Sequence, residues 1–336
     1  MKICLIGQNL TNLVLAVALA RKKISVDLYV NKKNIDFKTN RTIAISAENL
    51  EYLKFLISYK FSTWKTKEIK IYTKDLKSRE IINFKKKNKE VFNLITYTKL
   101  YNVFLKKLYK INNIKLIKTN TSSLTFIKAL KRYDLVINSE NKNIISQKFF
   151  YNKIRKDYKS TAYTFLIDHK KKINNIASQI FTKHGTIAFL PLSNVKTSIV
   201  ISYLGPMKNE NEIIKIFNNY NSLYDTKKMS KVEKFELVFS MLRNYTKKNI
   251  LAFGDLIHRI HPLAGQGFNM TIRDIKIIST LVNDKISLGL PIDISVAEDF
   301  QNSTKHLNYL YGKAIDGIYE FFRLDSNINN SISKPV

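Results

Sequence analysis

The stretch GDLIHRIHPLAGQGFN, residues 254–269, concentrates residue types that carry chemistry or control the backbone. It holds three of the nine glycines, two of the five histidines and one of the five prolines in a chain of 336 residues. A chain this poor in glycine is expected to keep glycines where the backbone needs their conformational freedom. The stretch is therefore the first candidate for a functional site.

The residues on either side predict how this stretch is positioned. The apolar run NILAF, residues 249–253, predicts a buried strand that ends at Gly254. Apolar residues at helical spacing predict a helix from Phe268 to about residue 284. The candidate site is therefore a loop between the end of a strand and the N-terminus of a helix.

Such a loop suits the binding of a flat or anionic ligand. Ligands of open α/β sheets bind beyond the carboxyl ends of the strands, where the Asp255 carboxylate can accept hydrogen bonds from ligand hydroxyls. Gly265 and Gly267 flank Gln266 and let the backbone approach a ligand without a Cβ in the way. The N-terminus of the following helix favours negative charge on that ligand.

Ordinary turn chemistry is the alternative interpretation of the same residues, because Gly-Asp commonly follows a strand. His258 and His261 are spaced i, i+3 in a loop that contains Pro262, and no third ligand is suggested. We therefore expect no metal site.

The N-terminus predicts a βαβ unit. KICLIGQ reads as a buried strand, TNLVLAVALARKK as a helix with Thr11 or Asn12 at its N-cap, and ISVDLYV (24–30) as a second strand. Residues 41–56 predict a loop that enters a helix, with Ser46 as its cap.

The middle of the chain predicts mixed structure. Helical spacing recurs at 97–110 and over 208–247, and strand-like runs include SSLTFIKAL, YDLVINS and several between 158 and 203. The runs between 158 and 203 have little helix between them and predict an antiparallel sheet.

The formal charge of +31 raises the question of nucleic acid as a partner. Only nine of the 57 basic residues are arginine, the residue that reads phosphates and bases bidentately, and the lysines form no long stripe. We therefore expect a lysine-rich surface and not a nucleic-acid site. Cys4, the single cysteine, lies in an apolar run and is expected to be a buried thiol. With no apolar run near bilayer length, a cytoplasmic location is expected, with peripheral contact at the inner membrane face left open.

At this point the motifs resemble a family. GDLIHRIHPLAGQGFNMTIRDI resembles the second flavin-binding motif of the FAD-dependent aromatic-ring hydroxylases, and HPLAGQGxN followed by RD resembles their ubiquinone-biosynthesis branch. RTIAIS, FTKHGTIAFLPL and YLYGKAIDGIYEFF resemble three further segments of that branch, which is para-hydroxybenzoate-hydroxylase-like.

The resemblance implies an α/β fold in which an antiparallel-sheet substrate domain interrupts a Rossmann-like FAD-binding domain. By residue number, the expected parts are 1–58, 95–150 and 235–290 for the FAD-binding domain, 59–94 and 151–234 for the substrate domain, 291–324 for C-terminal helices, and 325–336 for a disordered tail. The implied reaction is hydroxylation of a polyprenylated aromatic ubiquinone precursor by O2 through a flavin C4a-hydroperoxide, after NAD(P)H has reduced the FAD.

The resemblance also implies the residues that bind the cofactor. Asp255 would hold the ribityl or phosphate region, and Asn269 would begin the helix that points at the pyrimidine edge. The full set expected to contact the cofactor is Gly7, Arg41, Gly254, Asp255, Pro262, Ala264, Gly265, Gln266, Gly267 and Asn269. No catalytic base is identified. Arg41, His261 and Gln266 are expected to lie nearest the flavin, and His184 is a candidate in the substrate sheet that is more simply read as structural.

The first dinucleotide fingerprint departs from the family pattern. G-x-G-x-x-G reads here as residues 7–12, GQNLTN, so that asparagines replace the second and third glycines. The acidic residue expected after the second strand is replaced by Val30 or Asn31, and the family's G-A-D-G segment reads NSEN at 138–141.

Two functions therefore remain open. One is a working flavin hydroxylase with weakened FAD affinity. The other is a degenerate member of the family with weak or no FAD binding, which serves as a scaffold or partner in a quinone-biosynthesis complex.

Overall fold

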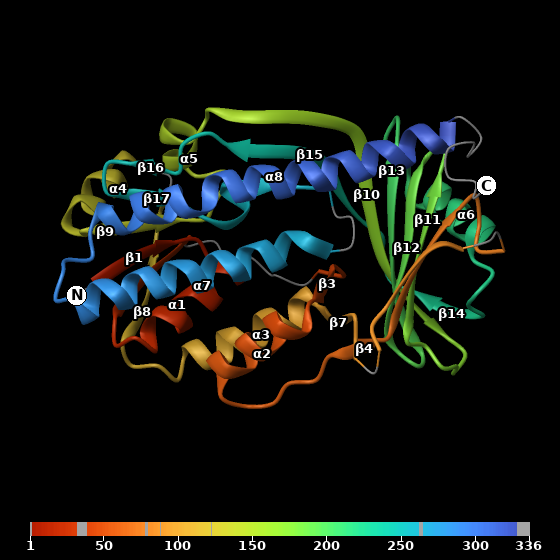
Figure 1. Cartoon of the computed structure of the whole chain (residues 1–336), viewed down its shortest axis with the longest axis horizontal. Coiled ribbons are helices and arrows are strands. Elements are labelled where there is room, and N and C mark those ends of the chain that lie inside the picture. The colour runs from red at the N-terminus through yellow and green to blue at the C-terminus, as the bar shows by residue number, and fades with distance from the viewer. Residues whose placement is uncertain are drawn as a thin grey trace.

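A computed structural model describes residues 2–31, 39–77, 80–87, 89–121, 123–261 and 265–327. Within these residues two large sheets face one another, joined by a small three-stranded sheet (Figure 1).

The first sheet has six strands in the order β16-β17-β9-β1-β2-β8. All neighbouring pairs are parallel except β16–β17, so the carboxyl ends of β1, β9 and β17 lie at one edge. The strands are β1 (Lys2–Ile6), β2 (Ser25–Asn31), β8 (Ile114–Thr119), β9 (Leu135–Asn138), β16 (Thr246–Lys247) and β17 (Ile250–Ala252).

Helices cover this sheet. Every residue of α1 (Leu10–Ala20) is buried, because apolar side chains surround it and it packs against both α3 and α7. The other helical segments of this half are α2 (Ala47–Ile57), α3 (Tyr97–Leu108), α4 (Leu124–Ala129), η1 (Leu130–Arg132), α5 (Ile144–Phe149), η2 (Gly254–Leu256) and α7 (Gln266–Ser287).

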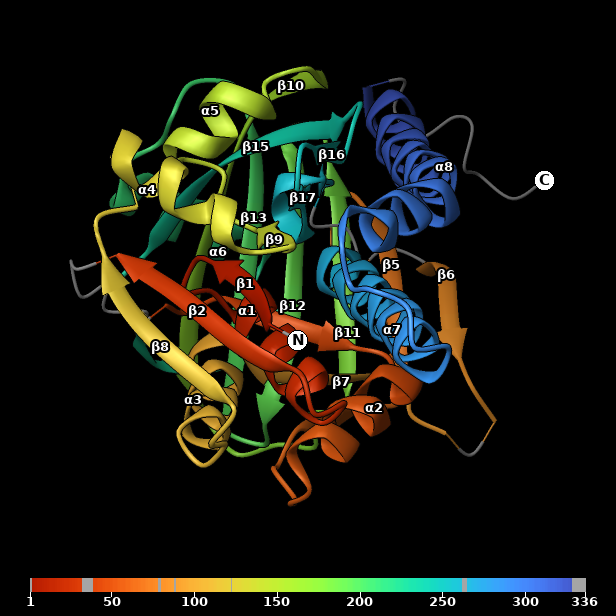
Figure 2. The ribbon, with the colours of Figure 1, turned by 90° about the vertical axis from the view of Figure 1, so that its left-hand side faces the viewer.

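The second large sheet is mostly antiparallel, and its main path runs β18-β15-β10-β13-β12-β11-β5-β6, with β14 paired to β10. Figure 2 shows it behind the six-stranded sheet. Its strands are β5 (Glu68–Thr73), β6 (Glu80–Lys85), β10 (Lys153–His169), β11 (Ile176–Thr182), β12 (Gly185–Ser193), β13 (Lys196–Leu204), β14 (Thr226–Met229), β15 (Glu233–Leu242) and β18 (His258–Arg259). The helix α6 (Glu210–Tyr220) packs through Ile213 and Phe217 on one face.

Two further elements connect the halves. The three-stranded sheet has the order β3-β7-β4, from β3 (Thr42–Ile45), β7 (Phe92–Thr96) and β4 (Trp64–Thr66). The 34-residue helix α8 (Ile294–Asn327) contacts β16 and β17 of one large sheet and β11 and β15 of the other (Figure 1).

The predicted α/β class, with an antiparallel sheet between parts of a parallel one, is confirmed. The βαβ unit, the Ser46 cap, the helix after residue 97 and the strand before Gly254 all form. Cys4 is buried, and this burial raises the pKa of its thiol well above the usual value.

Three local predictions were wrong. Asn9 and not Thr11 or Asn12 caps α1, because its side chain accepts the backbone N–H of Asn12. SSLTFIKAL contains helix α4 and not a strand, since the side chain of Ser123 caps its first turn. Residues 233–242 form strand β15 and not helix, because they pair with β10.

These elements bear on the expected domain boundaries. Strand β15 spans the boundary expected at residue 235, and the C-terminal part is one helix, α8, which continues through residue 327. The remainder of the expected tail, 328–336, lies outside the described residues.

Candidate functional site

The loop after β17 begins with a turn that only glycine fits well. Gly254 has a φ of +58°, and a Cβ on it would lie 2.9 Å from Cγ2 of Thr11 on α1. Asp255 follows in η2 and is exposed at the carboxyl edge of the parallel sheet. The strand, the glycine and the exposed carboxylate thus take the arrangement that the sequence predicts.

The N-terminus of α7 is built on a second such glycine. Gly265 has a φ of +64° and forms the N-cap, and a Cβ on it would lie 2.8 Å from the Cβ of Ala44. It offers no side-chain cap to the first amides of α7. Among the described residues, the cap position thus leaves to other groups the role of satisfying these amides, and a helix N-terminus of this kind favours an anionic one. Gly267 lies inside the first turn, where Thr271 donates to its carbonyl (3.3 Å).

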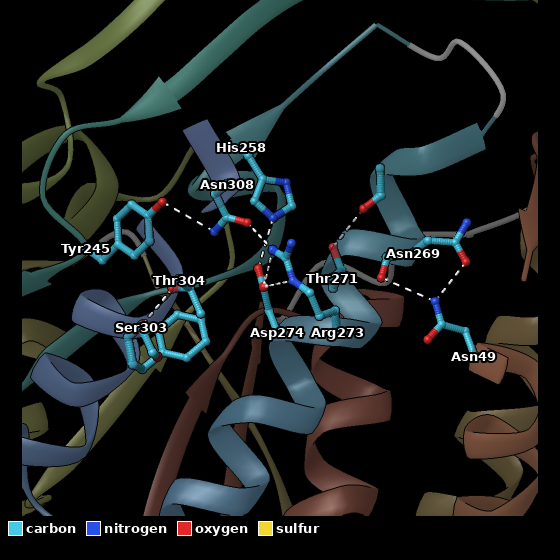
Figure 3. Close-up of polar contacts among 12 residues, drawn as sticks. Asn49, Tyr245, His258, Asn269, Thr271, Arg273, Asp274, Ser303, Thr304 and Asn308 are labelled. Carbon is cyan, nitrogen blue, oxygen red and sulfur yellow. Dashed lines mark hydrogen bonds and ion pairs between the residues drawn. The ribbon is translucent and has the colours of Figure 1, made fainter. Parts of the chain in front are cut away.

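Asn269 fastens α7 to the segment that follows β3. Its Nδ2 donates to the carbonyl of Ala44 (2.8 Å), and its Oδ1 accepts from the amide of Ser46 (3.0 Å) and from Nδ2 of Asn49 (3.0 Å; Figure 3). The Asn269 side chain therefore holds the start of α7 against the β3–α2 corner.

Arg41 lies just before β3, at the junction of the two halves. It is exposed, and its guanidinium lies 5.9 Å from the ring centroid of Tyr97 and 5.3 Å from that of Phe235 on β15. Close by, the side chain of Glu233 accepts hydrogen bonds from Thr39 and Asn40. Gln266, in the first turn of α7, accepts a hydrogen bond from the hydroxyl of Tyr311 on α8 (2.8 Å).

A buried ionic network, which sequence reasoning missed, fixes the other end of the loop (Figure 3). Nε2 of His258 lies 3.1 Å from Oδ2 of Asp274, and both side chains are buried. Arg273 donates to Oδ1 of Asp274 (2.7 Å) and to Asn308 on α8. Asn308 in turn donates to the hydroxyl of Tyr245 (3.4 Å). The RD pair of the motif therefore joins the loop, α7 and α8.

His261 lies in an aromatic cluster. Its ring stacks on Tyr319 with centroids 4.1 Å apart and meets the edge of Tyr158 at 5.3 Å. Burial lowers the pKa of His261 to about 3, although the nearby Asp316 carboxylate opposes this shift. Neither ring nitrogen has a hydrogen-bond partner in the part of the chain that the structure describes. His261 is therefore a neutral ring packed against two tyrosine rings.

Not every predicted site residue joins this group. Pro262 and Ala264 lie outside the described residues. His184 stacks on Tyr203 and lines a groove of about 490 Å³ beside α6, whereas the His261 cluster packs against α8. Within the described ranges, no group of three or more His, Cys, Asp and Glu side chains is placed to hold a metal ion.

The turn between β1 and α1 is filled by its own side chains. Gly7 has a φ of +114°, as a tight turn before a helix requires. Asn12 is fully buried, and its Nδ2 donates to the carbonyls of Ile6 and Gly7, each at 2.8 Å. The amide of Leu10 donates to the hydroxyl of Tyr97 (3.1 Å). Side chains from within and outside the turn therefore take several of its backbone hydrogen-bonding groups.

The fold defined by the two sheets is that of FAD-dependent monooxygenases. The structure of PqsL, a probable FAD-dependent monooxygenase from Pseudomonas aeruginosa, superposes with a TM-score of 0.74 at 14% identity, covering 98% of this chain and 100% of that one. CtdE, solved in complex with FAD and a substrate, superposes with a TM-score of 0.77 at 10% identity, covering 100% of this chain and 91% of CtdE. At such identities these likenesses establish the fold alone.

Similarity in sequence points to particular relatives. The mitochondrial ubiquinone biosynthesis monooxygenase COQ6 of Dictyostelium discoideum is 31% identical over 105 residues, which are 31% of this chain and 20% of that protein. COQ6 of Caenorhabditis elegans is 24% identical over 155 residues, which are 46% of this chain and 34% of that protein. The alignments thus span about a third or less of the relatives' length, and no protein-family model matches the chain. The resemblance to this branch that the sequence predicts is confirmed.

Proposed function

We propose that this protein is an FAD-dependent monooxygenase that hydroxylates an aromatic ring of a ubiquinone precursor, with NAD(P)H as reductant. The observation that supports it most is the geometry of residues 254–261 and 265–269, where Gly254 and Gly265 both adopt positive φ, near an exposed carboxylate and a helix N-terminus without a side-chain cap. The similarity to COQ6 proteins supports the substrate class.

The residues of this loop fit one half of the cofactor. The Asp255 carboxylate would hold ribityl hydroxyls, and the first amides of α7 would face the electron-rich edge of the ring system. When bound, the flavin supplies the redox and oxygen chemistry, which no protein side chain can supply.

The chain itself supplies binding and orientation. Nδ2 of Asn269 donates to the carbonyls of both Gly265 (3.2 Å) and Ala44 (2.8 Å), and these bonds hold the start of α7 in its direction. The neutral His261, held between Tyr158 and Tyr319, adds no charge to this region at neutral pH.

The proposed partners follow from the substrate class. A polyprenylated aromatic substrate resides in a membrane, and a chain of charge +31 is attracted to anionic lipid surfaces. No helix within the described residues is long and apolar enough to cross a membrane. We therefore propose peripheral contact with a membrane face, where partners of a quinone-biosynthesis complex would also assemble.

Reconstitution with excess FAD tests the proposal. The wild-type protein is expected to retain flavin after desalting, seen by visible absorbance, and to consume NADH or NADPH when an aromatic substrate is added. Asp255→Ala should weaken FAD binding about tenfold, because ribityl hydrogen bonds to a charged group are lost. Asp134→Ala, which removes an exposed carboxylate elsewhere, is the matched control. Absence of retained flavin in the wild type would rule out the enzymatic function.

A further inference from the structure

Helix α8 carries an apolar face that the other described elements leave exposed. Its large side chains are 37–62% exposed, and they are Leu307, Leu310, Tyr311, Ile318, Phe321 and Leu324. Ala314 and Gly317, which lie between them, are exposed as well. The opposite side of the helix is buried on the sheets through residues such as Ile315 and Phe322. Figure 2 shows α8 at the periphery of the molecule, and these eight residues are called here the α8 apolar face.

The spacing of these residues makes the face continuous. One straight stripe runs along the helix, because its members recur at intervals of three and four residues, at Leu307, Leu310, Ala314, Gly317, Phe321 and Leu324. Tyr311 and Ile318 widen the stripe to about 140° of the helix surface. Its length from residue 307 to residue 324 is about 26 Å at the usual helical rise. The face is therefore a broad apolar strip and not a scatter of single exposed residues.

The charged residues of this part of α8 lie beside the face. Within residues 307–324 they fall within about 80° of one another on one flank of the helix, at Lys313, Asp316, Glu320 and Arg323. This flank faces the second large sheet, since Lys156 on β10 pairs with both Asp316 (3.1 Å) and Glu320 (2.8 Å). The Lys313 ammonium lies 5.3 Å from the ring centroid of Phe239 on β15. A chain in which a quarter of the residues are charged thus keeps charge off this face.

The α8 apolar face adjoins the candidate site. The hydroxyl of Tyr311, a member of the face, donates to Gln266 in the first turn of α7 (2.8 Å). The first turn of α7 is where the proposed flavin would meet the protein. An apolar phase in contact with the face would therefore lie next to the proposed site.

Two kinds of occupant fit an apolar helix face, namely a second helix and a lipid bilayer. Paired helices use charged residues at the e and g positions beside the a/d stripe to set partner and orientation, and here the e positions hold Tyr311 and Ile318. Two copies of a chain of charge +31 also repel one another, whereas the same charge attracts an anionic lipid surface. Width and charge therefore favour the bilayer.

We infer that the α8 apolar face docks lengthwise on an anionic lipid bilayer. The helix lies along the membrane and does not cross it, because its opposite side is packed on the sheets. The Lys313 ammonium, at the border of the face, would reach the lipid phosphates. The inference rests on the proposed function in one respect, since a polyprenylated substrate would reach the site from the bilayer on which the face docks.

Flotation of the FAD-reconstituted protein with lipid vesicles tests the docking face. The vesicles contain phosphatidylcholine alone or an equal mixture with phosphatidylglycerol, and the wild type is expected to bind the mixture more tightly. Leu310→Glu/Leu324→Glu should lower the partition coefficient about tenfold, because two apolar side chains no longer enter the bilayer. Leu310→Ser/Leu324→Ser adds no charge and should lower it about fivefold, which separates lost apolar contact from added charge.

Phe55→Glu/Tyr109→Glu is the matched control. These side chains are 62% and 69% exposed, on α2 and at the end of α3, which lie across the molecule from α8 in Figure 1. The control adds the same two negative charges, and its partition coefficient should stay within about twofold of the wild type, because charges far from the bilayer are screened. An equal loss in this control would overturn the inference, since net charge would then explain the effect.

Sedimentation velocity tests a second copy as the occupant. If the wild type self-associates, Leu310→Glu/Leu324→Glu is monomeric, and both bind vesicles equally, the face is an interface between copies and the inference is overturned. Absence of wild-type binding to either kind of vesicle would also overturn it.

Flavin retention in the same samples separates the inference from the proposed function. If vesicle binding depends on the α8 apolar face but no flavin is retained, the inference stands and the flavin enzyme fails. If flavin is retained but vesicle binding is the same in Leu310→Glu/Leu324→Glu as in the wild type, the inference fails and the flavin enzyme stands.

Discussion

The N-termini of α1 and α7 make an instructive pair, because each helix follows a glycine with positive φ near the junction of the two sheets. At α1, Asn9 caps the first turn, and the hydroxyl of Tyr97 accepts a hydrogen bond from the amide of Leu10. At α7, Gly265 provides no side-chain cap. One helix end, the closed end, is capped by side chains, and the other, the open end, begins at a glycine that offers no side-chain cap. The flavin-motif resemblance persists at the open end, whereas the dinucleotide fingerprint has drifted at the closed one.

The largest effect is expected for a substitution at Gly265, at the open N-terminus of α7. Gly265→Val places a β-branched side chain at a φ of +64° and against Ala44, so we expect a loss of about 4 kcal/mol of stability and of all flavin retention. Gly289→Val is the control, because Gly289 has a φ of +66° with nothing within 4 Å of a Cβ. Urea denaturation and desalting with FAD measure the two effects. Equal losses in both variants would show that backbone strain alone, and not the Ala44 contact, matters.

The second largest effect is expected for removal of the buried Asp274 carboxylate on α7. Asp274→Ala leaves His258 and Arg273 without their buried carboxylate, and we expect about 3 kcal/mol of destabilisation. Asp284→Ala, on the exposed face of the same helix, should change stability by less than about 0.5 kcal/mol. Urea denaturation compares the two variants. A small effect of Asp274→Ala would mean that the network is not what anchors α7.

Acid should weaken the same region through His261. Its pKa is lowered to about 3 in the folded protein, so the unfolded chain binds a proton first as the pH falls below about 6.5. His261 therefore leaves the free energy of unfolding unchanged above that pH. Between that pH and about pH 3 the free energy of unfolding falls by about 1.4 kcal/mol for each pH unit. Denaturation at pH 7.5 and 5.5 measures it. His261→Phe should remove this part of the pH dependence, and His306→Phe, an exposed site on α8, should not.

The smallest effect on stability is expected for a substitution of Asn9, at the N-terminus of α1. Asn9→Ala removes the cap of α1 and a hydrogen bond to Ser139, so we expect about 1 kcal/mol of destabilisation. Asn209→Ala, which removes the equivalent cap of α6, should cost a similar amount and leave ADP affinity unchanged. Unaltered stability of Asn9→Ala would indicate that the other contacts of the turn suffice to hold it.

Much of this contrast could be predicted from the sequence, because it depends on local signals. Glycine, proline and a strand-like run mark residues 249–269, and the positive φ at Gly254 and Gly265 agrees with the expectation that such a chain keeps glycine where it is needed. The erosion of residues 7–12 is also visible in the sequence itself.

The rest depends on partners that sequence spacing does not reveal. The contact of Glu140 with Gly7 joins residues 133 positions apart across two neighbouring strands. Asp274 looks like an ordinary helix carboxylate until His258 and α8 enclose it. Strand β15 was mistaken for helix although Phe235, Leu237, Phe239 and Met241 alternate along it, a period-two signal that could have found it.

The long helix α8 has a mechanical consequence. At 34 residues it is about 51 Å long, and it is seated on strands of both large sheets. It ties Asn308 to Arg273 near its middle, and it stacks Phe322 on Phe181 near its C-terminal end, with ring centroids 4.2 Å apart. One continuous helix that is bound to both sheets opposes a hinge motion that would separate them. Relative movement of the two sheets would therefore require α8 to bend or to lose one of these contacts.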